Sequence, residues 1–330
     1  MVGHGEAEAV PDPDFVIHHD YEESFMEVVP PRTGKFIAVR TWDFGPFPPA
    51  WATKINDECD QLWVHTHWIR EQAIAGGIEA ERVRVVPLGV DPEIYRATGP
   101  RFRLNRPDRF IFLFVGTTVY RKGIDILLKA YTEAFNSQDD VSLVIKDHSG
   151  DVFYQDISYR GQIEELQQDP SSPEIILIDD FLTEEILAAL YRRCDVGVFP
   201  YRAEGFAIPI LEAMACGTPV VAPEFGACLD YVEPTCCHLL PARRVRLPVG
   251  KKLTFNTLGF EEVIEEVDFC ELPAETLAEY MRKLYSSPDR EGGRECARRL
   301  ESWVHDRFSW DASLDRITAC LKELGDAVEG

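Results

Sequence analysis

The chain has 330 residues, with 34 lysines and arginines against 57 aspartates and glutamates, so its formal net charge is −23. That length predicts about two domains of roughly 150 residues each. The hydrophobic fraction of 45% is enough to bury their cores, which excludes a wholly disordered chain. The acidic balance argues against duplex nucleic acid or an anionic membrane surface as a partner, because both need a basic face. A small anionic ligand stays compatible with it, since salt screens a distant acidic surface over about 8 Å.

The nine cysteines are scattered, with no C-x-x-C pair and no Cys/His spacing typical of a zinc site. Reduced thiols in a cytosolic protein explain them. The acidic N-terminal stretch lacks the apolar segment of a signal peptide, and no apolar run approaches the roughly 18 residues of a membrane span. We therefore expect a cytoplasmic protein with no integral membrane segment and no metal site.

The predicted elements alternate between short β-rich runs and amphipathic helical stretches, which is typical of parallel α/β units. The first hundred residues contain four predicted strands: Asp14–His19, Lys35–Thr41, Gln61–Thr66 and Val83–Leu88. Two helices are predicted between them, at Ala50–Cys59 and Trp68–Ala75. The charged stretch 91–109 that follows is marked by Pro and Gly and has little apolar periodicity. We interpret it as an interdomain linker.

A second α/β series begins at Phe110–Val115, which is apolar throughout, as expected for a strand buried on both faces. Further strands are predicted at Ser142–Lys146, Ile175–Ile178, Val196–Phe199 and Pro219–Ala222. Helices are predicted at Ile124–Phe135, 158–168, Glu184–Tyr191, 209–215, 274–286, 290–304 and 311–324. Residues 243–262 break this rhythm and are predicted to form an inserted loop. The pattern indicates two Rossmann-like domains that face each other across a cleft.

The most informative segment is EGFAIPILEAMACGTPVV, residues 204–221, in which Glu204 and Glu212 are eight residues apart. Pro209 suits the first turn of a helix, and the N–H groups of that first turn lack partners within the helix, which makes an anion site. Glu212, one turn into the helix, is placed to accept hydrogen bonds from a vicinal diol such as a ribose. Its neighbours are apolar, so we expect it to be partly enclosed, and a buried carboxylate needs polar partners.

A second segment, VGTTVYRKG at 115–123, follows the buried strand. Ligands of parallel sheets bind beyond the carboxyl ends of the strands, where this loop must lie. The adjacent cations Arg121 and Lys122 could there neutralise a pyrophosphate.

These segments, together with VVPLGVDPEIY (85–95) and FSWDASLDRI (308–317), resemble the family 4 retaining glycosyltransferases, also called glycosyl transferases group 1. The resemblance covers roughly residues 35–320, and it implies the two-domain B-type fold. It implies a short N-terminal acceptor-side domain (1–100), a nucleotide-sugar-binding domain (101–306) and a C-terminal helix crossing back (307–330). It further implies retaining, metal-independent transfer of a sugar, of hexosyl type, from a nucleotide diphosphate sugar, with no other cofactor. The acceptor would be a glycan, a lipid-linked sugar or a small molecule, as in polysaccharide or glycoconjugate biosynthesis.

Carried onto this sequence, the resemblance assigns Arg121 and Lys122 to the donor pyrophosphate and Glu212 to the ribose. Glu204 and the backbone of Phe206, Ala207 and Ile208 would hold the sugar and the distal phosphate, and Gly116 and Thr117 would complete the donor-binding loop. Two residues depart from the usual pattern: Thr117 stands where many relatives have Arg, and Ala207 replaces a glycine. Arg121 beside Lys122 could supply the missing cation.

The acceptor-side group of this family is usually a His of the N-terminal domain. His19 is our candidate for a catalytic role, and His18 and Asp43 are further acceptor-side candidates at strand ends. A satisfied structural histidine or a loop-capping aspartate explains each of them equally well. His65 and His67 could line the cleft, although a strand-to-helix turn also explains them. Aromatic residues near the expected cleft would suit stacking on a sugar or core packing: Trp42, Phe44, Phe47, Trp51 and Trp68.

The N-terminal domain has four predicted strands, whereas the family normally carries six or seven. Either the chain begins downstream of the true start or this domain is reduced, and a partner chain could then complete it. Two alternatives to an active transferase follow: a catalytically silent sugar-nucleotide-binding or partner subunit, and a sugar-nucleotide epimerase. A dehydrogenase is disfavoured, because no G-x-G-x-x-G follows a first strand.

Overall fold

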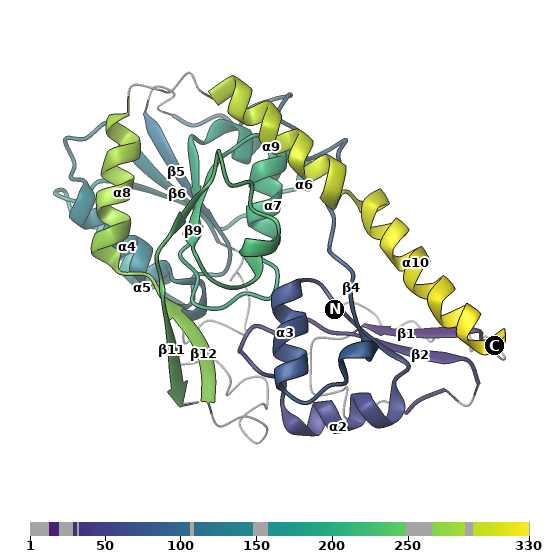
Figure 1. Cartoon of the computed structure of the whole chain (residues 1–330). Helices are drawn as coiled ribbons and strands as arrows, with labels where there is room; N and C mark the ends of the chain where they lie inside the picture. The colour runs from purple at the N-terminus through teal and green to yellow at the C-terminus, as the bar shows by residue number, and fades with distance from the viewer. Residues whose placement is uncertain are drawn as a thin grey trace.

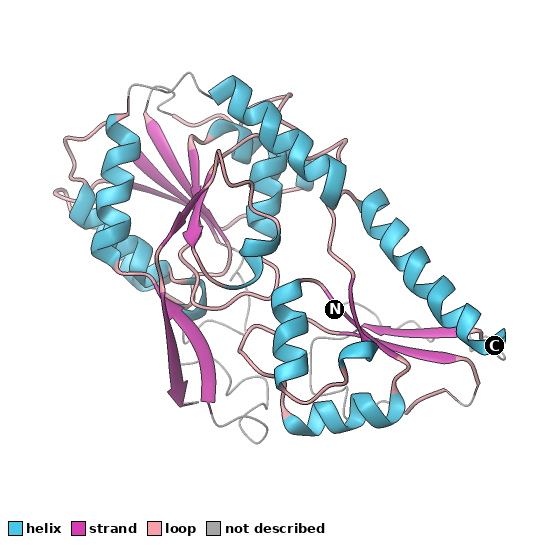
Figure 2. Cartoon of the chain, viewed as in Figure 1, coloured by secondary structure: helices cyan, strands magenta, loops and turns pink. Residues whose placement is uncertain are grey.

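The computed structural model describes residues 13–19, 29–31, 33–105, 109–147, 158–248, 266–287 and 293–329. Two parallel sheets form two domains, which Figure 1 shows joined by the long C-terminal helices. Figure 2 shows the alternation of strands and helices that the sequence pattern predicts. No helix within these ranges is long and apolar enough to span a membrane.

The first domain contains a four-stranded parallel sheet in the order β1-β2-β3-β4. Its strands confirm the four predicted ones: β1 (Phe15–His19), β2 (Lys35–Val39), β3 (Gln61–Val64) and β4 (Val83–Val85). Helices α2 (Pro49–Glu58) and α3 (His67–Ala75) cover one face. Successive residues of a strand point to opposite faces, so Phe36 and Ala38 pack toward these helices and Ile37 packs toward the C-terminal helix α10 (Trp310–Glu329).

The second domain contains a six-stranded parallel sheet in the order β10-β9-β8-β5-β6-β7. Its strands are β5 (Phe110–Val115), β6 (Val141–Lys146), β7 (Glu174–Ile178), β8 (Val196–Val198), β9 (Val220–Pro223) and β10 (His238–Leu240). β10 was not predicted. Phe110, Phe112 and Phe114 of β5 pack in one hydrophobic cluster, and the residues between them pack in another, which explains the unbroken apolar run.

Helices cover both faces of this second sheet. One face carries α4 (Ile124–Ala134), α5 (Arg160–Gln168) and α8 (Ala274–Ser286), and the other carries α6 (Glu184–Arg193), α7 (Ile208–Ala215) and α9 (Gly293–Phe308). Short 3-10 turns lie at Ala80–Arg82, Tyr120–Lys122 and Gly226–Asp230. All the predicted helices are confirmed in type, and residues 290–292 of the predicted helix 290–304 lie outside the described ranges.

The inserted loop predicted at 243–262 is wrong for its first residues. Arg243–Pro248 form strand β11, which pairs antiparallel with β12 (Glu266–Glu271), and residues 249–265 lie outside the described ranges. Pairing satisfies the backbone groups of each strand that face the other, and Arg244 and Arg246 both form ion pairs with Asp268 of the opposite strand. The alternation of arginine with Val245 and Leu247 was the overlooked signal.

The predicted linker 91–109 is packed rather than free. Tyr95 is buried in the core of the second domain, and the Phe102 N–H donates to the Ala189 carbonyl at 2.9 Å. The Arg192 side chain donates to the carbonyl oxygens of Arg96 and Pro100 at 3.0 and 2.8 Å. Two aromatic anchors and one arginine therefore attach this segment to α6.

The chain crosses between the domains twice, and the two crossings lie side by side. Val90 donates to the Phe308 carbonyl at 2.9 Å, and Trp310 donates back to the Val90 carbonyl at 3.2 Å. A Cβ on Gly89 would lie 2.6 Å from the Trp310 nitrogen, so only glycine permits this approach. Beyond the crossing α10 packs against the first sheet, where Arg84 donates to Glu323 at 2.9 Å.

The ribbon β11–β12 also joins the domains. Phe269 of β12 is 1% exposed and packs in the hydrophobic core of the first domain, 6.2 Å from the Phe44 ring. The neighbouring Asp268 N–H donates to the Phe44 carbonyl at 3.2 Å. A side chain of the second domain therefore completes the core of the first.

We predict that Phe269→Ala lowers the free energy of unfolding by about 3–5 kcal/mol, because it removes a buried ring and leaves a cavity. Urea unfolding followed by tryptophan fluorescence measures the change. Phe181→Ala is the matched control, since Phe181 is 92% exposed and its truncation should stay within about 0.5 kcal/mol of wild type. Equal stability of both variants would contradict the role of Phe269.

Candidate active site

The centre of the site is a cluster of four charged side chains at the contact between the two domains. Glu204 is 7% exposed, and its carboxylate forms ion pairs with Lys122 and with Arg121, the latter at 3.3 Å. Arg121 also reaches Asp43 of the first domain at 2.9 Å and donates to the Ala203 carbonyl at 2.9 Å. The structure thus brings together the predicted cation pair Arg121 and Lys122, Glu204 and the acceptor-side candidate Asp43, which come from three separate segments.

Local backbone geometry places the two cations. They end the 3-10 turn Tyr120–Lys122 that follows β5, and Gly123 then begins α4 in the left-handed conformation with φ 71°. A Cβ on Gly123 would lie 1.9 Å from the Pro200 carbonyl oxygen, so glycine is required where this turn meets the loop after β8. The Arg202 N–H donates to the Arg121 carbonyl at 2.8 Å. The cation turn and the Glu204 loop therefore lie next to each other.

Burial and neighbouring charges set the pKa values of the two carboxyl groups. Burial opposes ionisation of Glu204, but the charges and hydrogen bonds of Lys122 and Arg121 outweigh it and lower its pKa. Burial raises the pKa of Asp43, and the nearby Glu204 charge raises it further, whereas Arg121 lowers it. Glu204 is consequently the firmly ionised member of the pair.

The turn after Glu204 crosses onto the first domain. The Gly205 N–H donates to an Asp43 carboxylate oxygen, and a Cβ on Gly205 would lie 2.6 Å from Cγ2 of Thr41. Ala207 has φ 63°, the one positive φ of a non-glycine residue within the described ranges. This is the position where the family usually has glycine, and for alanine the conformation costs about 1–2 kcal/mol.

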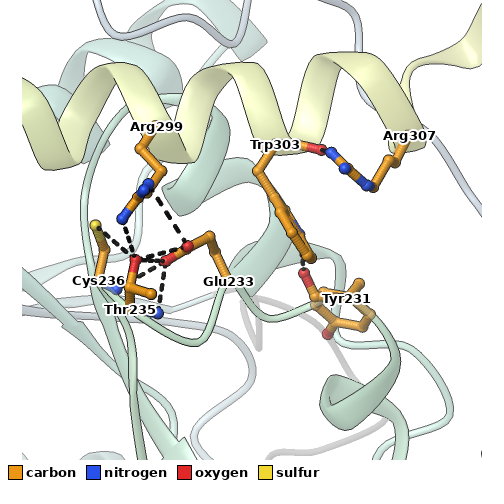
Figure 3. A network of polar contacts seen from close by, with 7 residues as sticks. All are labelled: Tyr231, Glu233, Thr235, Cys236, Arg299, Trp303 and Arg307. Atoms are coloured by element: carbon orange, nitrogen blue, oxygen red, sulfur yellow. Dashed lines mark hydrogen bonds and ion pairs between the residues drawn. The ribbon is translucent and has the colours of Figure 1, made fainter.

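Tyr231 fixes this turn in place. Its ring stacks on Phe206 with centroids 5.0 Å apart, and its hydroxyl donates to the Phe206 carbonyl and also lies 3.2 Å from that of Ala207. Figure 3 shows how Tyr231 is held in turn by α9, where Trp303 Nε1 donates to the Tyr231 carbonyl at 2.8 Å. With the carbonyls held this way, the N–H groups of Phe206, Ala207 and Ile208 donate to no other residue of the described ranges. They are available to an anion at the start of α7.

Glu212 lies within α7 and is partly enclosed, as predicted. The Tyr191 hydroxyl of α6 donates to its Oε2 at 2.7 Å, and Tyr95 is a second hydroxyl partner. Burial raises the pKa of Glu212 to about 7, although both tyrosine hydroxyls favour its ionised form. A carboxylate can accept up to about four hydrogen bonds, so two tyrosines leave capacity for a diol.

The remaining predicted residues lie around this centre. Gly116 follows β5 with φ 152°, and its N–H donates to the Lys146 carbonyl at 3.0 Å; Thr117 comes next in the same loop. His18 lies on β1, where its Nδ1 is 3.1 Å from Arg40 Nη2. The His19 ring stands edge-on to that of His65 at 6.3 Å. The assignment of His19 to catalysis stays a prediction.

The aromatic residues of the first domain form its core. Trp42, Phe47 and Trp51 are buried and pack against one another within 6.0 Å of ring centroids. The core explanation therefore holds for these three rather than stacking on a sugar. The sequence did not identify Thr41 or Tyr231 as residues of the site. For Thr41 a signal was available, because it ends a predicted strand; for Tyr231 there was none.

A small cavity lies at this centre, and a larger one lies away from it. A cavity of about 10 Å³ is lined by Lys122, Glu204, Ala207 and Pro209, among others. One of about 520 Å³ lies between α4, β11 and the start of α8, beside Arg202. Arg202 is bonded to Asp125 and Glu271 at 2.7 Å and stacks on Tyr120, which is a structural network. We place the chemistry at the smaller cavity because the converging polar groups lie there.

We predict that Glu212→Gln stabilises the folded protein most at alkaline pH. A carboxyl group whose folded pKa is about 7 against about 4.5 in the unfolded chain destabilises the fold as pH rises through this window. The variant should therefore exceed wild type by up to about 3 kcal/mol at pH 8 and by much less at pH 5. Thermal unfolding at both values measures this, and an offset independent of pH would refute the assigned pKa.

Comparisons with known proteins identify the second domain. Residues 100–242 match the family model described as glycosyl transferases group 1. D-inositol 3-phosphate glycosyltransferase 1 of Catenulispora acidiphila is 33% identical over 209 residues, which are 57% of this chain and 47% of that protein. MMP alpha-(1->4)-mannosyltransferase of Mycolicibacterium hassiacum is 33% identical over 166 residues, 49% of this chain and 37% of that protein. The match thus spans about half the length of the first relative and less than half of the second.

Solved structures resemble almost the whole chain. Sucrose-phosphate synthase from Thermosynechococcus elongatus has a TM-score of 0.69 at 19% identity and covers 95% of this chain and 74% of its own. HepE of Anabaena in complex with UDP and glucose has a TM-score of 0.66 at 18% identity. The match covers 88% of this chain and 72% of the HepE chain. Both likenesses concern the fold, which is the two-domain B-type fold with two Rossmann-like domains. The match to the glycosyl transferases group 1 therefore lies in the second domain, and the likeness in fold extends over both domains.

Proposed function

We propose that this chain transfers a sugar from a nucleotide diphosphate sugar to a hydroxyl group of a carbohydrate-type acceptor, with retention of anomeric configuration. The single observation that carries the proposal is the arrangement of Arg121 and Lys122 beside the turn 206–208. Two cations and a row of available N–H groups converge there on one small cavity. Relatives in the same family are named as glycosyltransferases, and a structural neighbour is described with UDP and glucose.

The chemistry follows from where charge develops. When the bond between the anomeric carbon and the diphosphate breaks, negative charge grows on the leaving phosphate. The acceptor oxygen bonds to the same carbon, and the acceptor hydroxyl gives up its proton, which the leaving diphosphate can accept. Preorganised donors at such a charge contribute about 3–4 kcal/mol each. Arg121, Lys122 and the N–H groups at the start of α7 would supply them, so the proposal needs no metal and no cofactor besides the donor.

Each remaining residue takes a part in this proposal. Glu204 orients both cations and would contact sugar hydroxyls, and Glu212 would accept hydrogen bonds from the ribose. Gly116 and Thr117 would border the diphosphate. His18, His19 and Asp43 remain acceptor-side candidates of the first domain. Retention and hexosyl specificity rest on the family resemblance.

We further propose that the protein works in the cytoplasm. All nine cysteines are free thiols in the structure, which suits a reducing compartment. The division into residues 1–100, 101–306 and 307–330 is likewise our proposal. It agrees with the two sheets and with α10 lying against the first of them.

The second candidate is a sugar-nucleotide-binding partner subunit without transferase activity. The first sheet favours it, because four strands are described there where the family usually has six or seven. Purified protein is incubated with UDP-, GDP- and ADP-sugars and a panel of sugar and polyol acceptors. Released nucleotide and the anomeric configuration of the product are then measured. A product of retained configuration supports the transferase, and nucleotide binding without turnover supports the partner subunit.

We predict that Lys122→Ala lowers turnover by about a hundredfold or more, because it removes a charge aimed at the leaving phosphate. The steady-state rate of nucleotide release measures this. Lys129→Ala is the matched control, since Lys129 lies on the outer face of α4 with its side chain 55% exposed. Near-normal turnover of folded Lys122→Ala protein would refute the role of Lys122.

A further inference from the structure

Four buried side-chain polar atoms of the first domain have no hydrogen-bond partner within the described ranges, and two of them belong to residues that the site has not used so far. These two are Nε2 of His65 and Oγ1 of Thr41. His65 is 4% exposed and follows β3, and Thr41 follows β2, which is the neighbouring strand of the parallel sheet. Both therefore lie at the carboxyl edge of the sheet, where parallel α/β domains bind their ligands.

The hydrogen bond of the other ring nitrogen determines what His65 can do. Its Nδ1 lies 3.0 Å from the Val86 carbonyl oxygen, which only accepts, so Nδ1 carries the proton. Burial lowers the pKa of His65 to about 4, so the ring is neutral at pH 7. Nε2 therefore carries a lone pair that can accept a hydrogen bond, and no described residue donates one to it.

Both residues lie beside the donor-side turn of the second domain. The His65 ring is edge-on to Phe206 at 6.3 Å, and the neighbouring Thr66 hydroxyl donates to the Gly205 carbonyl at 3.4 Å. Thr41 lies close to Gly205, because a Cβ added to Gly205 would stand only 2.6 Å from Cγ2 of Thr41. The pair therefore lies directly opposite the turn assigned to the donor sugar.

A purely structural contact does not need these polar atoms. Each buried polar group without a partner costs about 1–3 kcal/mol, and valine or phenylalanine of similar shape would avoid that cost. The nearby charges also restrict the ligand. Arg121 and Lys122 are paired with Asp43 and Glu204 and are assigned above to the donor diphosphate, so we do not count them toward recognition of the acceptor.

We propose that His65 Nε2 and Thr41 Oγ1 bind uncharged hydroxyl groups of the sugar or polyol acceptor. A hydroxyl of the acceptor donates to Nε2, and the threonine hydroxyl donates to or accepts from a second oxygen. The ligand reaches them when the turn 205–206 moves away from the first domain. This inference rests on the proposed function and specifies the acceptor chemistry of the same site.

The experiment compares two matched pairs of variants. His65→Asn keeps a donor at the Nδ1 position for Val86 and removes the Nε2 acceptor, whereas His65→Gln retains a polar atom near Nε2. Thr41→Val removes the hydroxyl, and Thr41→Ser retains it. Titration calorimetry with glucose, mannose and myo-inositol, each in the presence of UDP, measures binding independently of turnover. Thermal unfolding checks that every variant is folded.

We expect at least one of these neutral probes to bind wild type, and His65→Asn and Thr41→Val each to weaken that binding about tenfold, as loss of one hydrogen bond predicts. His65→Gln and Thr41→Ser should restore most of it, and UDP binding should be unchanged in all four. Where a probe is glycosylated, KM for it should rise more than kcat falls. Equal binding in all variants, or no binding of any probe to wild type, would overturn the inference.

Failure of the proposed function is a separate outcome. It would appear as neither hydrolysis nor transfer of any nucleotide sugar, while polyol binding could still follow the variant pattern above. Conversely, active transfer with variants that leave acceptor KM unchanged would remove only the roles of His65 and Thr41.

Discussion

The ion cluster around Glu204 is the interaction on which the site depends. A buried carboxylate is stable only when it is paired and hydrogen-bonded, and Glu204 has both cations of the β5 loop. Because Arg121 also binds Asp43, the same cluster connects both domains. Removal of any one member leaves an uncompensated charge at the domain contact, so the positions of all four side chains depend on one another. The overall charge of −23 has little influence here, since the cluster balances itself locally.

Close backbone approach lets this cluster form. Gly123 meets the Pro200 carbonyl, Gly205 meets Thr41, and a Cβ on Gly45 would lie 2.6 Å from Asp268. At each of these points a side chain would separate the segments that carry the charged groups. The ribbon β11–β12 then adds an apolar contribution, because Phe269 is buried in the core of the first domain. Charged contacts therefore define the geometry of the domain contact, and hydrophobic burial contributes to its stability.

The sequence predicted the parts of the molecule that depend on local pattern. The strand at Phe110–Val115 and the helix at Ile124–Phe135 were predicted from the spacing of apolar residues within each segment, and both are confirmed. The approach of Arg121 and Lys122 to Glu204 was also predictable, because parallel strands bring their carboxyl ends to one edge. Strand β11 was not, since its partner begins eighteen residues further along the chain and depends on Asp268 to pair with two arginines. The lone acceptor on His65 could not be predicted, because it follows from a hydrogen bond to Val86 that only the fold creates.

The paired crossing at Gly89–Val90 and Phe308–Trp310 has a consequence for how the domains move. Two connections that lie side by side and hydrogen-bond to each other allow rotation about the line between them. They resist sliding and twisting, because either motion would stretch one connection against the other. Rotation about this line would move the Gly205 turn relative to Asp43 and Thr41, which it contacts in the first domain. The first domain would therefore leave and return along one path, and Asp43 and Arg121 would meet in the same register in every cycle.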